Sequence, residues 1–149
     1  MAGAADAKKG KKRFFKAQVF SDGVMTVGKE ETITVFRMPP GATLKVFAEP
    51  LPVTPQCGTG PYFCDPELAL PAPTSQPFIA APNGTAILTF VMPATFLLED
   101  IFRPVNNRRA NFVDGQPIHV DVIGKRTVHH VKKLGFGFAR ASVQGPPPG

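Results

Sequence analysis

Short stretches of alternating hydrophobic and polar residues recur along the chain and predict β-strands. Residues 118–123 (IHVDVI) place Ile118, Val120 and Val122 on one face and His119 and Asp121 on the other, where an exposed polar pair is ordinary. Residues 31–37 (ETITVFR) and 42–48 (ATLKVFA) alternate in the same way. Successive side chains of a strand point to opposite faces, so each pattern predicts one buried face. Sustained helical spacing is scarce, because Pro and Gly interrupt it.

The segment MPPG at residues 38–41 predicts a tight turn. Pro40 fixes φ at the second position of the turn, and Gly41 permits a positive φ at the third. We therefore expect the strands on either side, residues 31–37 and 42–48, to pair as a hairpin.

The dipeptide Asn83-Gly84 predicts a second tight turn. Together with Thr85 it also matches a glycosylation acceptor, but the turn is the commoner meaning of this sequence. The following stretch, residues 85–92 (TAILTFVM), is almost wholly apolar. Such a run predicts a central strand that is buried on both faces.

The C-terminal stretch 134–143 (LGFGFARASV) alternates large and small side chains. Leu134, Phe136 and Phe138 share one face, which we expect to point into the core and to pack near Phe90. The glycines on the opposite face would let a neighbouring backbone or ring approach closely.

The histidines are the candidates for metal binding or general-base chemistry. Gly124 and Lys125 predict a turn, followed by a short strand at residues 127–131 that contains His129 and His130. Adjacent residues of a strand point to opposite faces, so these two cannot easily share one ion. We therefore expect no metal-binding or catalytic role for the histidines.

About seven or eight short strands separated by turn signals are typical of a two-sheet sandwich. We predict an all-β protein with a single antiparallel Ig-like β-sandwich at residues 17–144. A flexible basic tail (residues 1–16) and a tail rich in Pro and Gly (residues 145–149) flank it.

Composition supports a globular chain with many turns: 43% of its 149 residues are hydrophobic, and it has 17 Pro and 14 Gly. No apolar run approaches the roughly 20 residues of a membrane-spanning helix, so no transmembrane segment is expected. The start of the chain fits an A-x-A cleavage site at residues 5–7 without the apolar segment that precedes such sites. Either a leader has been removed, or the protein is made and kept as written, in a cytoplasm or a virus particle.

The basic charge is concentrated at the N-terminus. Residues 1–16 contain one acid and account for +5 of the net charge of +6. The basic residues there are Lys8, Lys9, Lys11, Lys12, Arg13 and Lys16. Such a block is either a solvated arm or a site that attracts anions without sequence specificity. A second group, Arg103, Arg108 and Arg109, offers the same two alternatives.

The chain has two cysteines, Cys57 and Cys64, in the segment CGTGPYFC. The eight-residue loop that they enclose can close as a disulfide, which would contribute roughly 2–2.5 kcal/mol. Two unpaired thiols or a metal site are the alternatives, although the spacing is wider than zinc sites usually have. No nucleophile, zinc-protease or phosphate-binding motif is present. We therefore expect no catalytic residues and no cofactor.

Three segments together resemble a known family. MPPGATLKVFAEP, the cysteine-closed loop ending in FCDP, and PNGTAILTFVMP are similar to secreted actinobacterial Ig-like β-sandwiches, such as the enediyne-carrier apoproteins of the neocarzinostatin type. The resemblance implies an exported, non-enzymatic sandwich with Cys57 and Cys64 as a structural bridge. The carriers have a second disulfide, for which this chain has no cysteines, and this departure argues against ligand carriage.

These observations predict a secreted or cell-surface domain that acts by binding or by structural association. Its partner would be an anionic cell-surface polymer, met by the basic N-terminal tail, or other protein subunits; sequence-specific binding of nucleic acid is not expected. The alternative is a structural component of a virion or filament whose tails become ordered on assembly, which would make the protein oligomeric. A small-molecule carrier with a Phe-lined cleft is the third hypothesis.

Overall fold

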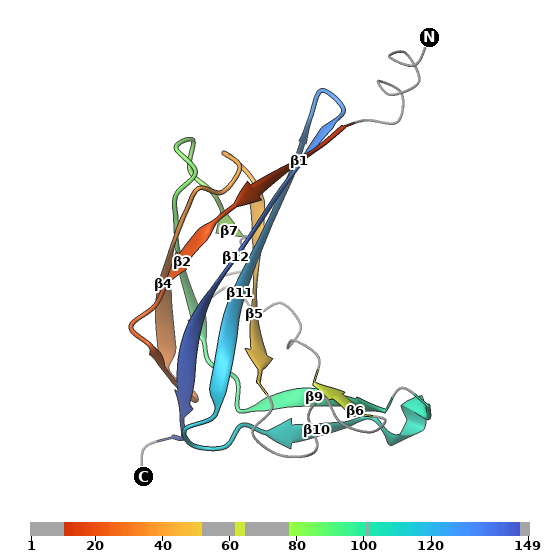
Figure 1. Ribbon diagram of the computed structural model, residues 1–149. Helices are drawn as coiled ribbons and strands as arrows, with labels where there is room; N and C mark the ends of the chain where they lie inside the picture. Colours follow the sequence, from red (N-terminus) through yellow and green to blue (C-terminus); the bar gives the residue numbers. More distant parts are fainter. Residues whose placement is uncertain (1–10, 52–61, 65–77, 101, 147–149) are drawn as a thin grey trace.

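The computed structural model describes residues 11–51, 62–64, 78–100 and 102–146, and these residues form an all-β fold (Figure 1). The strands are β1 (Lys11–Lys16), β2 (Gln18–Phe20), β3 (Val24–Thr26), β4 (Glu30–Phe36), β5 (Thr43–Pro50), β6 (Tyr62–Cys64), β7 (Phe78–Ile79), β8 (Ala86–Val91), β9 (Thr95–Asp100), β10 (Arg108–Asn111), β11 (Pro117–Val128) and β12 (Val131–Gln144). One short 3-10 helix, η1 (Pro104–Asn106), lies between β9 and β10. The described residues include no helix that could serve as a membrane span.

Two sheets share one core. The large sheet has the order β1-β12-β11-β5-β7, with β3 also pairing with β12, and the small sheet has the order β2-β4-β8. This arrangement matches the C-F-G and A-B-E strands of an immunoglobulin sandwich. A third sheet, β10-β9-β6, lies across one end of the sandwich (Figure 1). The predicted all-β sandwich is therefore confirmed.

The core lies between the large and small sheets and is made mainly of aliphatic side chains and methionines. Its largest fully buried side chains are Phe90, Met25, Ile33, Met38, Leu88, Met92, Ile118, Val35, Val46, Val120 and Val122, and Leu98 of β9 in the third sheet belongs to the same cluster. The alternation predicted for residues 118–123 is confirmed, because β11 buries Ile118, Val120 and Val122 in this core.

Strand β12 faces opposite to the sequence prediction. Phe136 and Phe138 are 50% and 43% exposed, whereas Gly135, Gly137 and Ala139 point into the core. The expectation that the two phenylalanines pack inside the sandwich is therefore wrong. The predicted close approach at the small residues is present, because a Cβ on Gly137 would lie 2.6 Å from the backbone oxygen of Ala17.

The two predicted tight turns exist, but neither joins the strands of a hairpin. The amide of Ala42 donates to Pro39 O at 3.0 Å, and Gly41 has φ +73°, as expected for the MPPG turn. Strand β4 nevertheless pairs with β2 and β8, and β5 pairs with β11 and β7, so this turn carries the chain from one sheet to the other. The Asn83-Gly84 turn likewise separates β7 of the large sheet from β8 of the small one.

Strand β8 is not the doubly buried central strand that its apolar sequence predicted. It lies at the edge of the small sheet as far as the described residues extend, and Ile87 is 73% exposed on the side away from the core. Only one face of β8, with Leu88 and Phe90, is buried.

Strands β11 and β12 form one long hairpin in place of the predicted turn at Gly124. Both run without a break on either side of His129 and His130, which have φ 49° and 64°. Positive φ at both central residues of a two-residue loop defines the type I′ hairpin turn. The two histidines therefore lie in a turn and not in a strand.

The N-terminal residues that the structure describes belong to the sandwich and not to a tail. Residues 11–16 form β1, which pairs in parallel with the first half of β12. Figure 1 shows β1 and the β11–β12 hairpin extending together beyond the rest of the sandwich. The predicted boundary after residue 16 thus moves back to Lys11, and residues 1–10 lie outside the described part.

Candidate functional site

The side of the large sheet that is turned away from the small sheet, here called the outer face, carries an ordered array of side chains. The strand registers of β1, β12, β11 and β5 align these side chains in rows across the sheet. Starting at the His129-His130 turn and moving away from it, there are five rows. The first holds Lys12, Lys132 and Thr127; the second Phe14, Leu134, Lys125 and Thr43; the third Lys16, Phe136, Ile123 and Lys45; the fourth Phe138, Asp121 and Phe47; and the fifth Arg140, His119 and Glu49. Residues two apart on one strand share a face, so rows succeed one another about every 7 Å.

The first three rows, here called the cationic rows, combine lysines with exposed apolar side chains. Five lysines lie in these rows, and no acidic residue occupies a position in them. Phe14 is 77% exposed, and Ile123 is 41% exposed. Exposed apolar side chains that gather into a patch mark candidate interaction sites, and here they alternate with charges of one sign.

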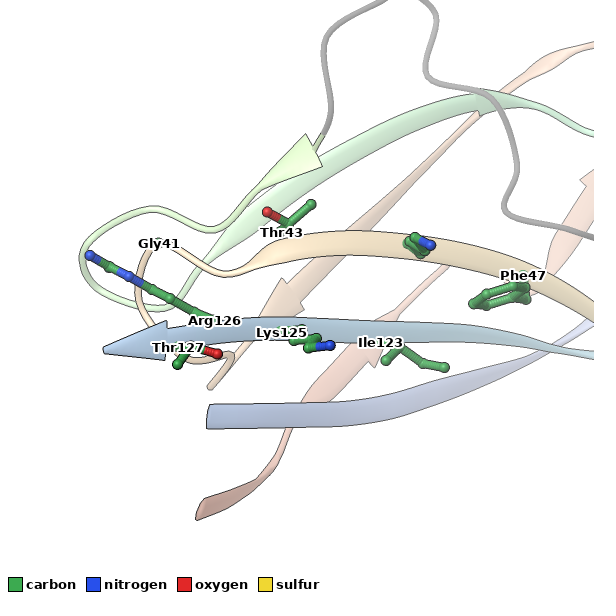
Figure 2. A pocket seen from close by; sticks show the side chains of 8 residues that line it. Gly41, Thr43, Phe47, Ile123, Lys125, Arg126 and Thr127 are labelled. Carbon is green, nitrogen blue, oxygen red and sulfur yellow. The ribbon is translucent and has the colours of Figure 1, made fainter. Parts of the chain in front are cut away.

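Two hollows on the outer face meet at Ile123. One has a volume of about 680 Å³, and Figure 2 shows Thr43 and Phe47 of β5 beside Ile123 and Lys125 of β11 along it. The other, of about 480 Å³, lies between Phe14 of β1 and neighbouring side chains of β12. The outer face is therefore both positively charged and hollowed.

The predicted anion-binding residues are divided by the structure. Lys12 and Lys16 point to the outer face, because they align with Lys132 and Phe136 of β12. Lys11 and Arg13 alternate to the other side of β1. The remaining two, at positions 8 and 9, lie outside the described residues. Lys45 of β5, Lys125 of β11 and Lys132 of β12 complete the array. Only the pairing of these strands shows that the five lysines share one face.

The fourth and fifth rows hold a different chemistry. Glu49 of β5 lies directly opposite His119 of β11, with 3.9 Å between Oε2 and Nδ1. The imidazole of His119 stacks on Phe138, with ring centroids 4.4 Å apart. Asp121 lies one row further along β11 and is only 5% exposed. The exposed polar pair expected from the sequence is therefore wrong for Asp121, because side chains of the neighbouring strands cover it.

The burial of Asp121 changes its acidity. Desolvation, a hydrogen bond shared with Glu49 and repulsion by the Glu49 carboxylate raise the pKa of Asp121 to about 8. Its Oδ1 has no hydrogen-bond partner among the described residues. An unsatisfied buried polar atom is uncommon and calls for an explanation.

The arginine group belongs to the third sheet, at and beside the β9–β10 connection. Arg109 of β10 donates to the Thr95 hydroxyl at 2.8 Å, and Arg103 precedes η1. Asp100 organises this connection by accepting hydrogen bonds from the amides of Phe102 and Arg103 at 3.0 and 3.1 Å. Desolvation acts to raise the pKa of Asp100, but these hydrogen bonds and others together lower it. The fixed loop geometry is structural and leaves the arginine group a weaker candidate than the outer face.

The predicted bridge between Cys57 and Cys64 remains a prediction. Cys64 ends β6, but Cys57 lies outside the described residues. Comparisons with protein-family models, with curated proteins and with solved structures find no match for the chain.

Proposed function

We propose that the protein is a non-enzymatic binding domain that holds a linear anionic polymer against its outer face. The observation that carries this proposal is the gathering of five lysines in the cationic rows, without an acidic residue among them. Charges of one sign on one face attract polyanions and make their binding dependent on salt. The apolar side chains between the lysines supply contact for the uncharged parts of the polymer.

The proposed partner is a cell-surface polymer that carries phosphate or carboxylate groups. Rows of the outer face repeat about every 7 Å, so the lysines form a series of positive charges along the face, as binding of a linear polyanion requires. An exported protein would meet such a polymer, and the resemblance to secreted Ig-like sandwiches motivates this location. The N-terminal lysines take part as members of β1, and not as a separate arm.

The proposal is tested by measuring affinity for inorganic polyphosphate and for a polyuronic acid at several salt concentrations. The face variant, with Lys12, Lys125 and Lys132 replaced by Gln, removes three charges from the cationic rows. Its matched control removes three exposed charges elsewhere, by replacing Lys29, Arg37 and Arg103 with Gln. We expect the face variant to lose at least about tenfold in affinity and to show a weaker salt dependence, because each phosphate contact contributes about one unit to the salt slope.

Two outcomes would contradict the proposal. Equal losses in the face variant and in its control would mean that net charge alone attracts the polymers. Tighter binding of oligo(dT) than of polyphosphate of equal charge would point to a single-stranded nucleic acid, whose bases stack on aromatic side chains. The ratio between polyphosphate and polyuronic acid distinguishes a phosphate-bearing partner from a carboxylate-bearing one.

A second candidate function, as a subunit of a virion or filament, is favoured by the small sheet. Its solvent side carries Phe20 and Phe36 in edge-to-face contact at 5.6 Å, beside the exposed Ile87. Within the described residues, no strand pairs with the outer edge of β8, and such an edge can accept a strand of another subunit. Sedimentation at increasing concentration tests this candidate: self-association that Ile87→Lys abolishes would support it, and a monomer at all concentrations would contradict it.

A further inference from the structure

The fifth row of the outer face and the neighbouring Asp121 bring three metal-ligating side chains together. Glu49 belongs to β5, and His119 and Asp121 belong to β11. One potential ligand atom from each residue lies within 4.8 Å of the other two. Glu49 is at least 70 positions away from His119 and Asp121 in the sequence. The cluster therefore exists only because β5 and β11 pair in this register.

An independent observation points to a ligand at this cluster. Asp121 is 95% buried, since it is only 5% exposed, and its Oδ1 has no hydrogen-bond partner among the described residues. Phe47 and Phe138 are its neighbours in the row on either side, and neither can donate a hydrogen bond to a carboxylate. A buried carboxyl oxygen without a hydrogen-bond partner is costly, and a bound cation would satisfy it.

We propose that Glu49, His119 and Asp121 bind a divalent transition-metal ion, such as Zn²⁺, at the lower end of the outer face. Two carboxylates and one imidazole form a donor set that suits these ions. The site does not depend on the binding of an anionic polymer, because none of its three residues belongs to the cationic rows.

The geometry allows the three side chains to close on an ion with small movements. Zinc lies about 2.0–2.2 Å from oxygen and nitrogen ligands, so the ligand atoms must approach to about 3.5 Å from one another. The side chain of Glu49 is 38% exposed and can rotate toward the other two. The ring of His119 is already oriented by its stacking on Phe138, and the exposed Arg140 ends the same row beyond it.

A divalent cation held between Glu49 and Asp121 would neutralise the two neighbouring carboxylates and keep both as ligands. Three protein ligands leave at least one coordination position for water or for an anionic group.

The experiment titrates the untagged full chain, with any free thiols alkylated beforehand, with Zn²⁺ and, separately, with Co²⁺. Equilibrium dialysis gives the stoichiometry, the visible spectrum of Co²⁺ reports its coordination, and thermal unfolding reports stabilisation by the metal. We expect one ion per chain and a melting temperature that rises with metal concentration. Asp121→Asn, His119→Gln and Glu49→Gln should each lose at least about tenfold in affinity, the loss found when even an outer-shell partner of a metal ligand is removed.

Matched controls separate the site from the general attraction of metals to His and Asp. Asp114→Asn and His130→Asn remove the same functional groups from exposed positions and should bind the metal like the unaltered chain. Absence of stoichiometric binding, or unchanged affinity in His119→Gln and Glu49→Gln, would overturn the proposal. These two variants alter partly exposed side chains, so they remain informative if Asp121→Asn does not fold.

Discussion

Strands β11 and β12 are neighbours in one sheet, yet they divide their side chains by opposite rules. Strand β11 turns Ile118, Val120 and Val122 into the core. Strand β12 turns glycine and alanine inward and exposes Phe136 and Phe138. The hydrophobic alternation of each strand is equally clear in the sequence, so the pattern alone does not decide which face is buried.

The difference arises from what lies across the core from each strand. A Cβ on Gly135 would meet Met38 Sδ at 2.5 Å, and a Cβ on Gly137 would meet the Ala17 carbonyl oxygen at 2.6 Å. The chain crossing from β1 to β2, together with the MPPG turn, therefore fills the space above β12. Large side chains had to point outward, which leaves Phe136 and Phe138 about half exposed on the outer face. Exposed apolar side chains that gather into one patch mark candidate interaction surfaces.

The largest effect that sharpens this comparison is expected at Phe90. Its ring is fully buried against the inner faces of both sheets. Phe90→Ala should lower the free energy of unfolding by about 3–5 kcal/mol, because a large side chain is lost and a cavity is left. Urea unfolding followed by circular dichroism measures this change. A loss below about 1 kcal/mol would show that the sandwich does not pack as described.

The next effect is expected from a single added methyl group on β12. Gly137→Ala places its Cβ 2.6 Å from the Ala17 oxygen, and should destabilise the fold by about 1–3 kcal/mol by overpacking. Gly145→Ala is the control, since its Cβ would meet nothing nearer than Asp114 Oδ1 at 3.9 Å. If both variants unfold at the same urea concentration, the close approach of the β1–β2 crossing to β12 is wrong.

A smaller effect concerns pH and the buried carboxyl of the outer face. Asp121 has a pKa of about 8 in the folded protein, against 3.8 for its ordinary value. The folded state therefore holds a proton that the unfolded chain releases, so this group makes stability fall as pH rises from about 4 to about 8. Asp121→Asn should flatten the pH dependence in this window when a chelator is present, whereas Asp114→Asn should not. Parallel pH profiles for Asp121→Asn and the unaltered chain would contradict the raised pKa.

The smallest effect is expected at the exposed ring of Phe136. Half of its surface is already in solvent, so Phe136→Ala should change the free energy of unfolding by less than about 1 kcal/mol. The same variant should weaken the binding of polyphosphate, because it removes an apolar contact from the cationic rows. A loss of stability as large as that of Phe90→Ala would restore the inward orientation that the sequence suggested.

The sequence was informative where a local pattern has one physical solution. The alternation at residues 118–122 fixes the inward face of β11, and Pro40 followed by Gly41 fixes a turn. The sequence was misleading where a strand pairs with residues that are distant in the chain. The same MPPG turn can close a hairpin or carry the chain between sheets, and only the pairing of β4 with β2 and β8 decides between them.

The functional site was less predictable than the fold for the same reason. Lys12 and Lys16 were recognised as basic, but their alignment with the lysines of β11 and β12 follows from a parallel pairing that no local motif signals. Asp121 looked exposed, because its burial depends on side chains of two neighbouring strands. The His129-His130 turn was missed because type I′ turns usually carry Asn-Gly or Gly-rich pairs.

Hydroxyl-radical footprinting of the phenylalanines, with and without polyphosphate, tests most directly that the aromatic face of β12 is an exposed binding surface. Phe14, Phe136 and Phe138 should be oxidised readily in the free protein and should be protected when polyphosphate is bound. Phe90 should be unreactive in both states, since it is fully buried. Slow oxidation of Phe136 and Phe138 in the free protein, or rapid oxidation that saturating polyphosphate leaves unchanged, would contradict this account of the outer face.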